Sequence, residues 1–209
     1  MGIKTNLLEP SLGGVLRAAL DAADDELIVV NPSQPVIEEL LEELTEGSGP
    51  TVGVLADENV LKQLTRDFKL ASVAADLIDA GRLELFAYDG TDNTLLVTEE
   101  SVVAVVDAGG QVAGLATDDE GFIAGAYEQH TGALDRAEEF SLRTPGLSRV
   151  RETLAERIGE SAAADFDAVL TSMESARGDG DGLDEVTISL LVAAKNDELL
   201  YDISKWGED

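Results

Sequence analysis

The chain has 209 residues, 44% of them hydrophobic, which is enough for one or two folded domains with a real core. Its charge is extreme, because 43 acidic residues against 14 basic ones give a formal net charge of −29. The absence of cysteine excludes disulfides, thiolate metal sites and cysteine nucleophiles, and no apolar run approaches the ~20 residues of a membrane helix.

The acidic residues are spread along the whole chain, and the periodic apolar residues between them argue against a disordered acidic protein. Such a chain repels itself at ordinary ionic strength, whereas at molar salt the Debye length falls to ~3 Å. We therefore predict a protein adapted to a salt-rich cytoplasm, as in halophiles, with an acidic mesophilic protein as the alternative. The same screening means that the negative charge does not exclude DNA as a partner. The N-terminus has no apolar signal core, which predicts a cytoplasmic protein without a membrane partner.

The first 80 residues alternate between helical and strand patterns. Apolar residues recur at helical spacing over 12–23, 36–44 and 70–80, and a further helix follows Asp57. Pro35 suits the first turn of the second of these helices, and Asp57 suits an N-cap. A short, wholly apolar run at 27–30 and a second run at 51–56 predict buried strands.

From residue 83 the period changes to that of strands. Four strands are predicted, at 83–88, 94–98, 101–106 and 111–116, with hairpin turns at 99–100 and 107–110. A helix at 119–140 is expected to cover them. The fold class is therefore α/β, with a mixed sheet and flanking helices forming one domain over residues 1–142.

The last third of the chain is predicted to be helical. One helix starts at Thr144-Pro145 and a second is capped by Ser161; their apolar stripes predict a linker and dimerisation segment at 143–177. After the glycine-rich stretch 177–182, an apolar run at 186–194 and an amphipathic helix at 197–206 resemble half of a helix-turn-helix. A strand at 186–192 is the alternative for the first of them. We expect residues 178–209 to form a partial winged helix-turn-helix that lacks its recognition helix and wing.

Several segments carry a family resemblance. They are Asn31-Pro-Ser33, Leu55-Ala-Asp57, Leu95-Leu-Val-Thr98, Leu142–Leu154, Asp165–Leu170 and Ala176–Lys195. Through them the chain resembles the haloarchaeal TbsP-type transcriptional regulators, and its N-terminal part is similar to the effector domain of TrmB-type regulators. The resemblance implies a phospholipase-D-like effector domain without catalysis and a winged helix-turn-helix that controls metabolic genes. It also implies that family members continue beyond Trp206-Gly-Glu-Asp209, so that DNA is bound through the full-length C-terminal domain.

A ligand site is expected at the carboxyl ends of the strands, where open α/β sheets bind their ligands. The candidates are Asn31, Ser33, Asp57, Glu58, Thr98 and Thr117. Their ligand would be a small metabolite or a partner regulator, although Asn31 and Asp57 also fit simple capping roles. Lys195, Lys205 and Trp206 are candidates for positions near DNA, with core packing as the other interpretation of Trp206. No cofactor is predicted.

His130 is the only histidine, which limits the possible chemistry. A phospholipase-D site needs His-x-Lys, but Thr131-Gly132 follow, so the chain is predicted not to be an enzyme and His130 to be an exposed bystander. One histidine without cysteine excludes an ordinary zinc site. The carboxylates at 179–185 do not have EF-hand spacing and are interpreted as an interdomain linker.

Four arginines, at 143, 149, 151 and 157, fall within fifteen residues. They are expected to pair with Glu152, Glu156 and Glu160 at helical spacing. Contact with phosphates or with a second subunit is the alternative.

The function predicted from these observations is a homodimeric transcriptional regulator, of which this chain supplies mainly the effector and dimerisation module. The alternatives are a ligand-sensing or protein-interaction module that does not bind DNA, and an enzyme related to phospholipase D.

Overall fold

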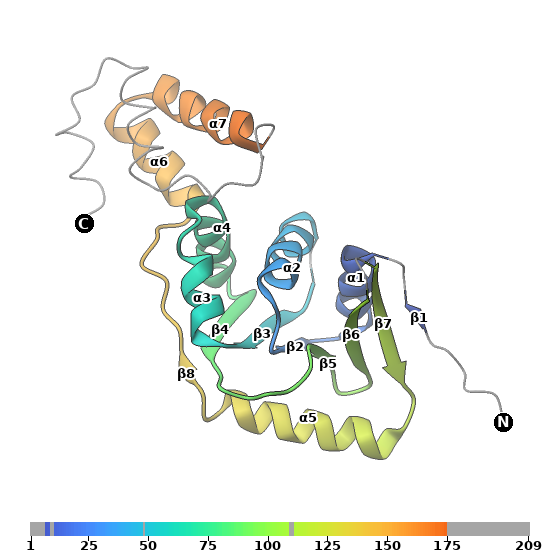
Figure 1. The fold of residues 1–209 in the computed structure, drawn as a ribbon. Coiled ribbons are helices and arrows are strands. Elements are labelled where there is room, and N and C mark those ends of the chain that lie inside the picture. The colour runs from blue at the N-terminus through green and yellow to red at the C-terminus, as the bar shows by residue number, and fades with distance from the viewer. Residues whose placement is uncertain (1–6, 9–10, 48, 109–110, 175–209) are drawn as a thin grey trace. The chain divides into compact units, whose positions relative to one another are not determined.

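The computed structural model describes residues 7–8, 11–47, 49–108 and 111–174. The chain divides into two compact units (Figure 1). Unit 1 combines residues 1–64 with Leu77–Ser141, and unit 2 combines Thr65–Asp76 with the chain from Leu142 onward. The second unit thus takes a segment from the middle of the sequence.

Unit 1 is built on one mixed sheet, which has eight strands in the described residues, in the order β1-β7-β6-β5-β2-β3-β4-β8. Strands β2 (Glu26–Val30), β3 (Thr51–Ala56) and β4 (Leu83–Ala87) are parallel. Strands β5 (Leu95–Val97), β6 (Val102–Ala108) and β7 (Gln111–Thr117) form an antiparallel meander, and β5 pairs with β2. The short strands β1 (Leu7–Leu8) and β8 (Glu138–Glu139) lie at the two edges. The predicted mixed α/β fold is confirmed.

Helices cover both faces of this sheet. Helices α1 (Leu12–Ala22) and α2 (Gln34–Glu46) lie on one face, and α5 (Glu120–Leu134) lies on the other (Figure 1). Ser11 starts α1, because its hydroxyl accepts a hydrogen bond from the backbone N–H of Gly14 at 3.1 Å. Pro35 lies in the first turn of α2, as the sequence predicts. The short helix α3 (Glu58–Leu64) follows β3.

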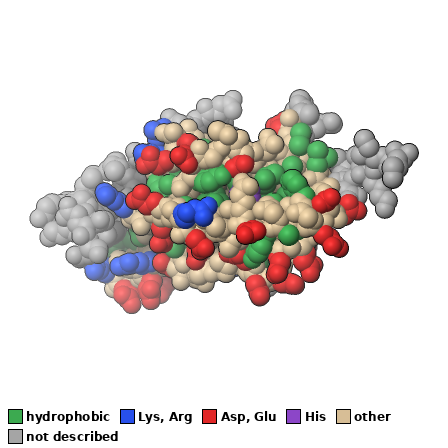
Figure 2. Space-filling view, turned by 90° about the horizontal axis from the view of Figure 1, so that it is seen from below, with side chains coloured by type: hydrophobic (Ala, Val, Ile, Leu, Met, Phe, Trp, Pro, Cys, Tyr) green, Lys and Arg blue, Asp and Glu red, His purple; other side chains and the backbone are tan. Residues whose placement is uncertain are grey.

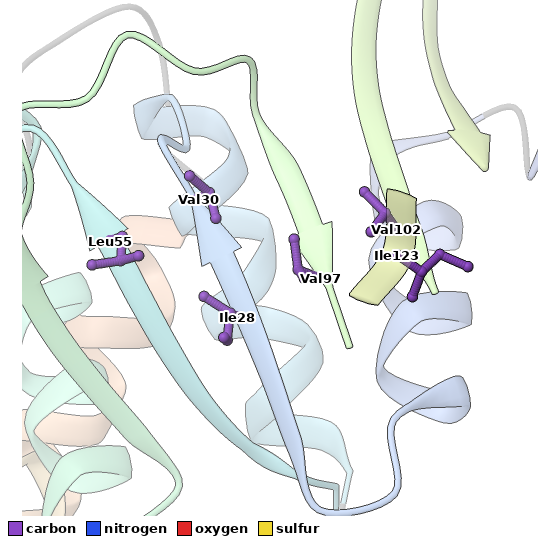
Figure 3. Close-up of a cluster of buried hydrophobic side chains, with 6 residues drawn as sticks. All are labelled: Ile28, Val30, Leu55, Val97, Val102 and Ile123. Atoms are coloured by element: carbon purple, nitrogen blue, oxygen red, sulfur yellow. The ribbon is translucent and has the colours of Figure 1, made fainter. Parts of the chain in front are cut away.

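The layer between the sheet and α5 is an apolar cluster drawn from four strands and the helix. It contains Ile28, Val30, Leu55, Val97, Val102 and Ile123 (Figure 3). Gly53 of β3 also lies against α5, because a Cβ placed there would lie 3.1 Å from Cδ1 of Leu134. The missing side chain of Gly53 lets α5 pack closely against the sheet.

Two predicted details differ from the structure. The helix expected over 119–140 ends at Leu134, because the following residues pair with the edge of the sheet: β8 joins β4, and the backbone N–H of Phe140 donates to the carbonyl of Leu85 at 2.7 Å. Ser161 is not a cap, because helix α7 (Glu160–Glu174) already begins one residue before it. The break before α7 is Gly159, whose φ of +132° favours glycine.

Unit 2 packs three helices around its own core. Helices α6 (Leu147–Arg157) and α7 contribute Leu147, Leu154, Phe166 and Leu170, and α4 (Phe68–Asp79) contributes Phe68. The rings of Phe68 and Phe166 meet edge to face, with centroids 6.4 Å apart. The apolar stripes that suggested a dimer interface at 143–177 are therefore used within this unit.

Helix α6 has an unusual cap, which comes from another helix. Its N-cap residue, Gly146, makes no side-chain capping bond, but Asp76 of α4 accepts hydrogen bonds from the backbone N–H of Ser148 at 3.1 Å and from its hydroxyl at 2.5 Å. A carboxylate at this end also complements the helix dipole. Asp76 thereby fixes where α6 begins.

No helix in the described part of the chain is long and apolar enough to span a membrane.

Candidate functional site

A polar network closes the carboxyl end of β2. The loop between β4 and β5 passes over this end, and the side-chain amide of Asn31 donates to the carbonyl of Asp92 at 2.5 Å. The hydroxyl of Thr94 donates to the carbonyl of Asn31 at 2.9 Å. Asn31 itself has a φ of +46°, the left-handed region that asparagine tolerates better than most residues. The turn after β2 and the β4–β5 loop are thus locked together.

Tyr88 holds the other side of the same loop. Its hydroxyl donates to Oδ2 of Asp92 at 2.5 Å, and this bond, together with burial, raises the pKa of Tyr88 to about 12. The loop folds back over the ring so closely that a Cβ on Gly90 would collide with it. Asp92 is therefore fixed both through its backbone and through its carboxylate.

His130 lies under this edge and is buried, with only 2% of its surface exposed. The expectation of an exposed bystander is wrong, because His130 belongs to the face of α5 that carries Ile123 and Leu134 against the sheet. Its Nδ1 has no hydrogen-bond partner among the residues that the structure describes. Burial lowers the pKa of His130, while the nearby charge of Asp92 opposes that shift. The imidazole is therefore neutral at neutral pH.

Four of the six predicted ligand residues lie at this edge. Asn31 and Ser33 follow β2, and Asp57 and Glu58 follow β3, which is parallel to β2. Asp57 caps α3 by accepting the backbone N–H of Asn59 at 2.8 Å, and Glu58 pairs with Lys62 at 2.8 Å. Ser33 is exposed and makes no capping bond with its side chain.

Thr98 and Thr117 lie at the other end of the strands, opposite the end that carries Asn31. They follow β5 and β7, and both strands run antiparallel to β2. The hydroxyl of Thr98 accepts the backbone N–H of Ser101 at 2.9 Å and so closes the β5–β6 turn. The hydroxyl of Thr117 accepts the N–H of Asp119 before α5. The structure does not bring these two residues to the edge that carries Asn31.

Sequence reasoning missed Tyr88, Asp92, Thr94 and the burial of His130. The polar run 89–93 falls between the predicted strands at 83–88 and 94–98, and its sequence predicts no contact with β2. Its composition does suggest a loop, but its partner across the sheet depends on β5 pairing with β2, and no local pattern encodes that pairing.

A hollow lies between α1 and α2, with a volume of about 470 Å³. Arg17 crosses it and binds Glu43 through two hydrogen bonds of 2.9 and 2.7 Å. Burial, together with the neighbouring Glu42 and Glu43, raises the pKa of Glu39 in the same groove. Among the described residues, no group of three or more His, Asp or Glu side chains is placed to hold a metal ion.

The arginines of α6 do not follow the predicted pairing. Arg151 Nε lies 2.6 Å from Oδ1 of Asp167 in α7, and no pair with Glu152, Glu156 or Glu160 is found among the described residues. Lys195, Lys205 and Trp206 lie outside the described residues, so their predicted position near DNA stays a prediction.

Comparison with known proteins gives two matches to family models that together cover almost the whole chain. Residues 4–145 match the model "Transcriptional regulator TbsP-like, N-terminal". Residues 146–209, which include α6 and α7, match "Transcriptional regulator TbsP-like, C-terminal HTH domain". None of the curated proteins matches the sequence.

Two solved structures are similar to this chain at low identity. The archaeal chromatin protein TrmBL2, whose structure was described as showing a novel mode of DNA binding, is 18% identical with a TM-score of 0.44, covering 63% of this chain and 52% of its own. Nuc, a phospholipase D family member from Salmonella typhimurium, is 10% identical with a TM-score of 0.40, covering 60% of this chain and 88% of its own. This chain therefore spans about half the length of the TrmBL2 chain. On the two family matches, which reach from residue 4 to residue 209, the chain belongs to the TbsP-like transcriptional regulators.

Proposed function

We propose that this chain is a haloarchaeal, cytoplasmic DNA-binding regulator of metabolic genes, in which unit 1 senses an effector and unit 2 belongs to the DNA-binding domain. The observation that carries the proposal is the helix-turn-helix match over residues 146–209, which includes the packed helices α6 and α7. The net charge of −29 supports a salt-rich cytoplasm, where the charge is screened. The metabolic role follows from the family resemblance alone.

The effector is proposed to act at the edge of the sheet that carries Asn31. Three hydrogen bonds hold the β4–β5 loop there, and Asn31 keeps a backbone conformation that costs free energy unless its surroundings support it. A small polar metabolite that replaces these bonds would release the loop and shift the population between two states. Ser33, Asp57 and Glu58 are the neighbouring polar residues that such a ligand would meet.

Dimerisation belongs to the same proposal, because regulators of this kind read two half-sites with two copies of the reader. The apolar faces of α4, α6 and α7 are used inside unit 2, so the proposed dimer uses other surfaces. Light scattering at molar KCl should give twice the mass of one chain. A monomeric mass would remove dimerisation from the proposal.

The test of DNA binding is selection from a random pool of duplexes by the purified chain at molar KCl, followed by gel-shift titration. Enrichment of one sequence, bound more tightly than a shuffled duplex, is the expected result. No enrichment by this chain or by one continued past residue 209 would overturn the proposal. Tighter binding by the continued chain would support the expected incomplete reader, and equal binding would contradict it.

The effector proposal has a separate test. Asp92→Ala removes the carboxylate that Tyr88 holds, and it should change the effect of candidate metabolites on DNA affinity while the chain remains folded. Glu138→Ala, an exposed residue of edge strand β8, is the matched control. If both variants respond to the same metabolite as the unaltered chain, the effector site lies elsewhere.

A further inference from the structure

The negative charge of the chain is divided unevenly between its two units. Unit 1, residues 1–64 and 77–141, carries 26 acidic and 5 basic residues, a net charge of −21. Unit 2, residues 65–76 and 142–209, carries 17 acidic and 9 basic residues, a net charge of −8. Figure 2 shows the acidic side chains scattered over the face of the molecule that it views. Residues 146–209, where the family match places the DNA-binding domain, hold six of the fourteen basic residues of the chain.

Within unit 2, different sides of α6 carry different kinds of side chain. Leu147, Val150, Leu154 and Ile158 face the core. Arg151 lies on the flank next to α7, where its guanidinium pairs with Asp167. Arg149, Thr153 and Arg157 are spaced four residues apart and form a row on another side of the helix. From Arg149 to Arg157 this row spans about 12 Å along the helix axis.

The two arginines at the ends of this row are exposed, and neither forms an ion pair with any residue that the structure describes. Glu152, three residues after Arg149, and Glu156, one residue before Arg157, are exposed, and neither forms an ion pair with these arginines among the described residues. Thr153 between them donates its hydroxyl to the carbonyl of Arg149 at 2.8 Å, so it adds no charge. In a chain with three acidic residues for each basic one, these two exposed arginines lie eight positions apart in one row of α6 without an ion pair to any described residue.

We propose that Arg149 and Arg157 bind two phosphates of the DNA backbone and so position the reader without reading sequence. The inference rests on the proposed function and names a contact surface within it. A planar guanidinium matches phosphate in a bidentate geometry, and phosphate contacts fix register on the duplex while base contacts supply specificity. At molar salt, where long-range attraction is screened, short direct contacts of this kind carry the electrostatic part of binding.

The test is a double variant, Arg149→Gln with Arg157→Gln, titrated with KCl against two duplexes: the one selected by the unaltered chain, and its shuffled counterpart. Each lost phosphate contact lowers the slope of log affinity against log salt by about 0.9, so the slope should fall by about 2. Affinity should fall by the same factor on both duplexes. Arg151→Gln, which removes an arginine that is already paired, is the matched control and should leave the slope unchanged.

The outcomes separate the two levels of the proposal. If neither this chain nor one continued past residue 209 binds either duplex, the proposed function falls and this inference falls with it. If the unaltered chain binds and the double variant keeps its slope, only the inference is overturned. A loss confined to the selected duplex would also overturn it, because it would show base reading. Arg149→Lys with Arg157→Lys keeps the charge, so it should keep the slope at reduced affinity and rule out misfolding as the cause.

Discussion

Gly53 shows how much a single carbon atom decides in this fold. It is buried in β3, and a Cβ there would lie 3.1 and 3.2 Å from the two methyl carbons of Leu134. Gly53→Val should therefore overpack the layer under α5 and lower the free energy of unfolding by about 1–3 kcal/mol. Leu134→Ala in the same chain makes room, so the double variant should cost less than the sum of the two single changes. Strictly additive costs, measured by urea unfolding at molar KCl, would contradict this account.

His130 should make stability depend on pH in a defined direction. Burial lowers its pKa in the folded chain below 6.5, the ordinary value of a histidine side chain. As the pH falls below about 6.5, the unfolded chain takes up a proton that the folded chain does not, so stability falls. Above that pH both states are neutral and the contribution vanishes.

The measurement compares the unaltered chain with His130→Leu. As the pH falls below about 6.5, the unaltered chain should lose unfolding free energy relative to His130→Leu. The loss should be no more than about 1.4 kcal/mol per pH unit. The carboxylates are the same in both chains, so their titration cancels. Parallel pH profiles for the two chains would show that the imidazole gains its proton freely in the folded state.

The sequence identifies some of the residues at the carboxyl end of β2 and misses others. Asn31 was selected because it follows a buried strand, and the structure finds it bonded to the loop that closes the edge. Asp92 was not selected, because its position depends on a contact between residues 61 positions apart. Helical periodicity alone places His130 seven residues after Ile123, which was the available signal that it faces the core.

At the scale of elements, Asp76 and α6 form a cap that joins distant parts of the sequence. Asp76→Ala removes the acceptor for the N–H and the hydroxyl of Ser148, and should lower the free energy of unfolding by about 1 kcal/mol, as lost caps do. Asp79→Ala, at the exposed end of the same helix, is the control and should change it by less than about 0.5 kcal/mol. Equal effects of the two changes would show that the cap adds nothing beyond a surface charge.

Element boundaries were easier to predict than their arrangement. The strand at 51–56 is predicted with its observed bounds, since a mostly apolar run between a Gly-Pro break and Asp57 is a local signal. The order of strands was not predicted, because nothing in residues 94–98 indicates that β5 pairs with β2. This pairing reverses the direction of the next strands and carries Thr98 and Thr117 away from Asn31. The expectation of one common rim assumed that the strands were parallel.

At the scale of the whole molecule, the charge predicts a fold that needs salt. Unit 1 has 26 acidic and 5 basic residues, so its folded form concentrates repulsion that the unfolded chain relieves. Its thermal unfolding midpoint, followed by circular dichroism, should rise steadily as KCl is raised from the decimolar to the molar range. Sucrose, which stabilises by exclusion without screening charge, is the control and should not replace the salt. A midpoint independent of KCl would argue for the mesophilic alternative.

Helix α4 determines where the chain can be divided into parts that keep a complete core. Its residues up to Asp76 complete the core of unit 2, although they lie in the middle of the sequence of unit 1. A chain cut after residue 142 would keep Phe68 and Val73 but lose the helices that bury them, and a chain begun there would lack part of its own core. The two modules therefore cannot be exchanged as a simple cassette by joining genes at one point. A recombination that replaces the helices after residue 142 must also bring a matching segment 65–76, because Phe68 and Val73 belong to their core.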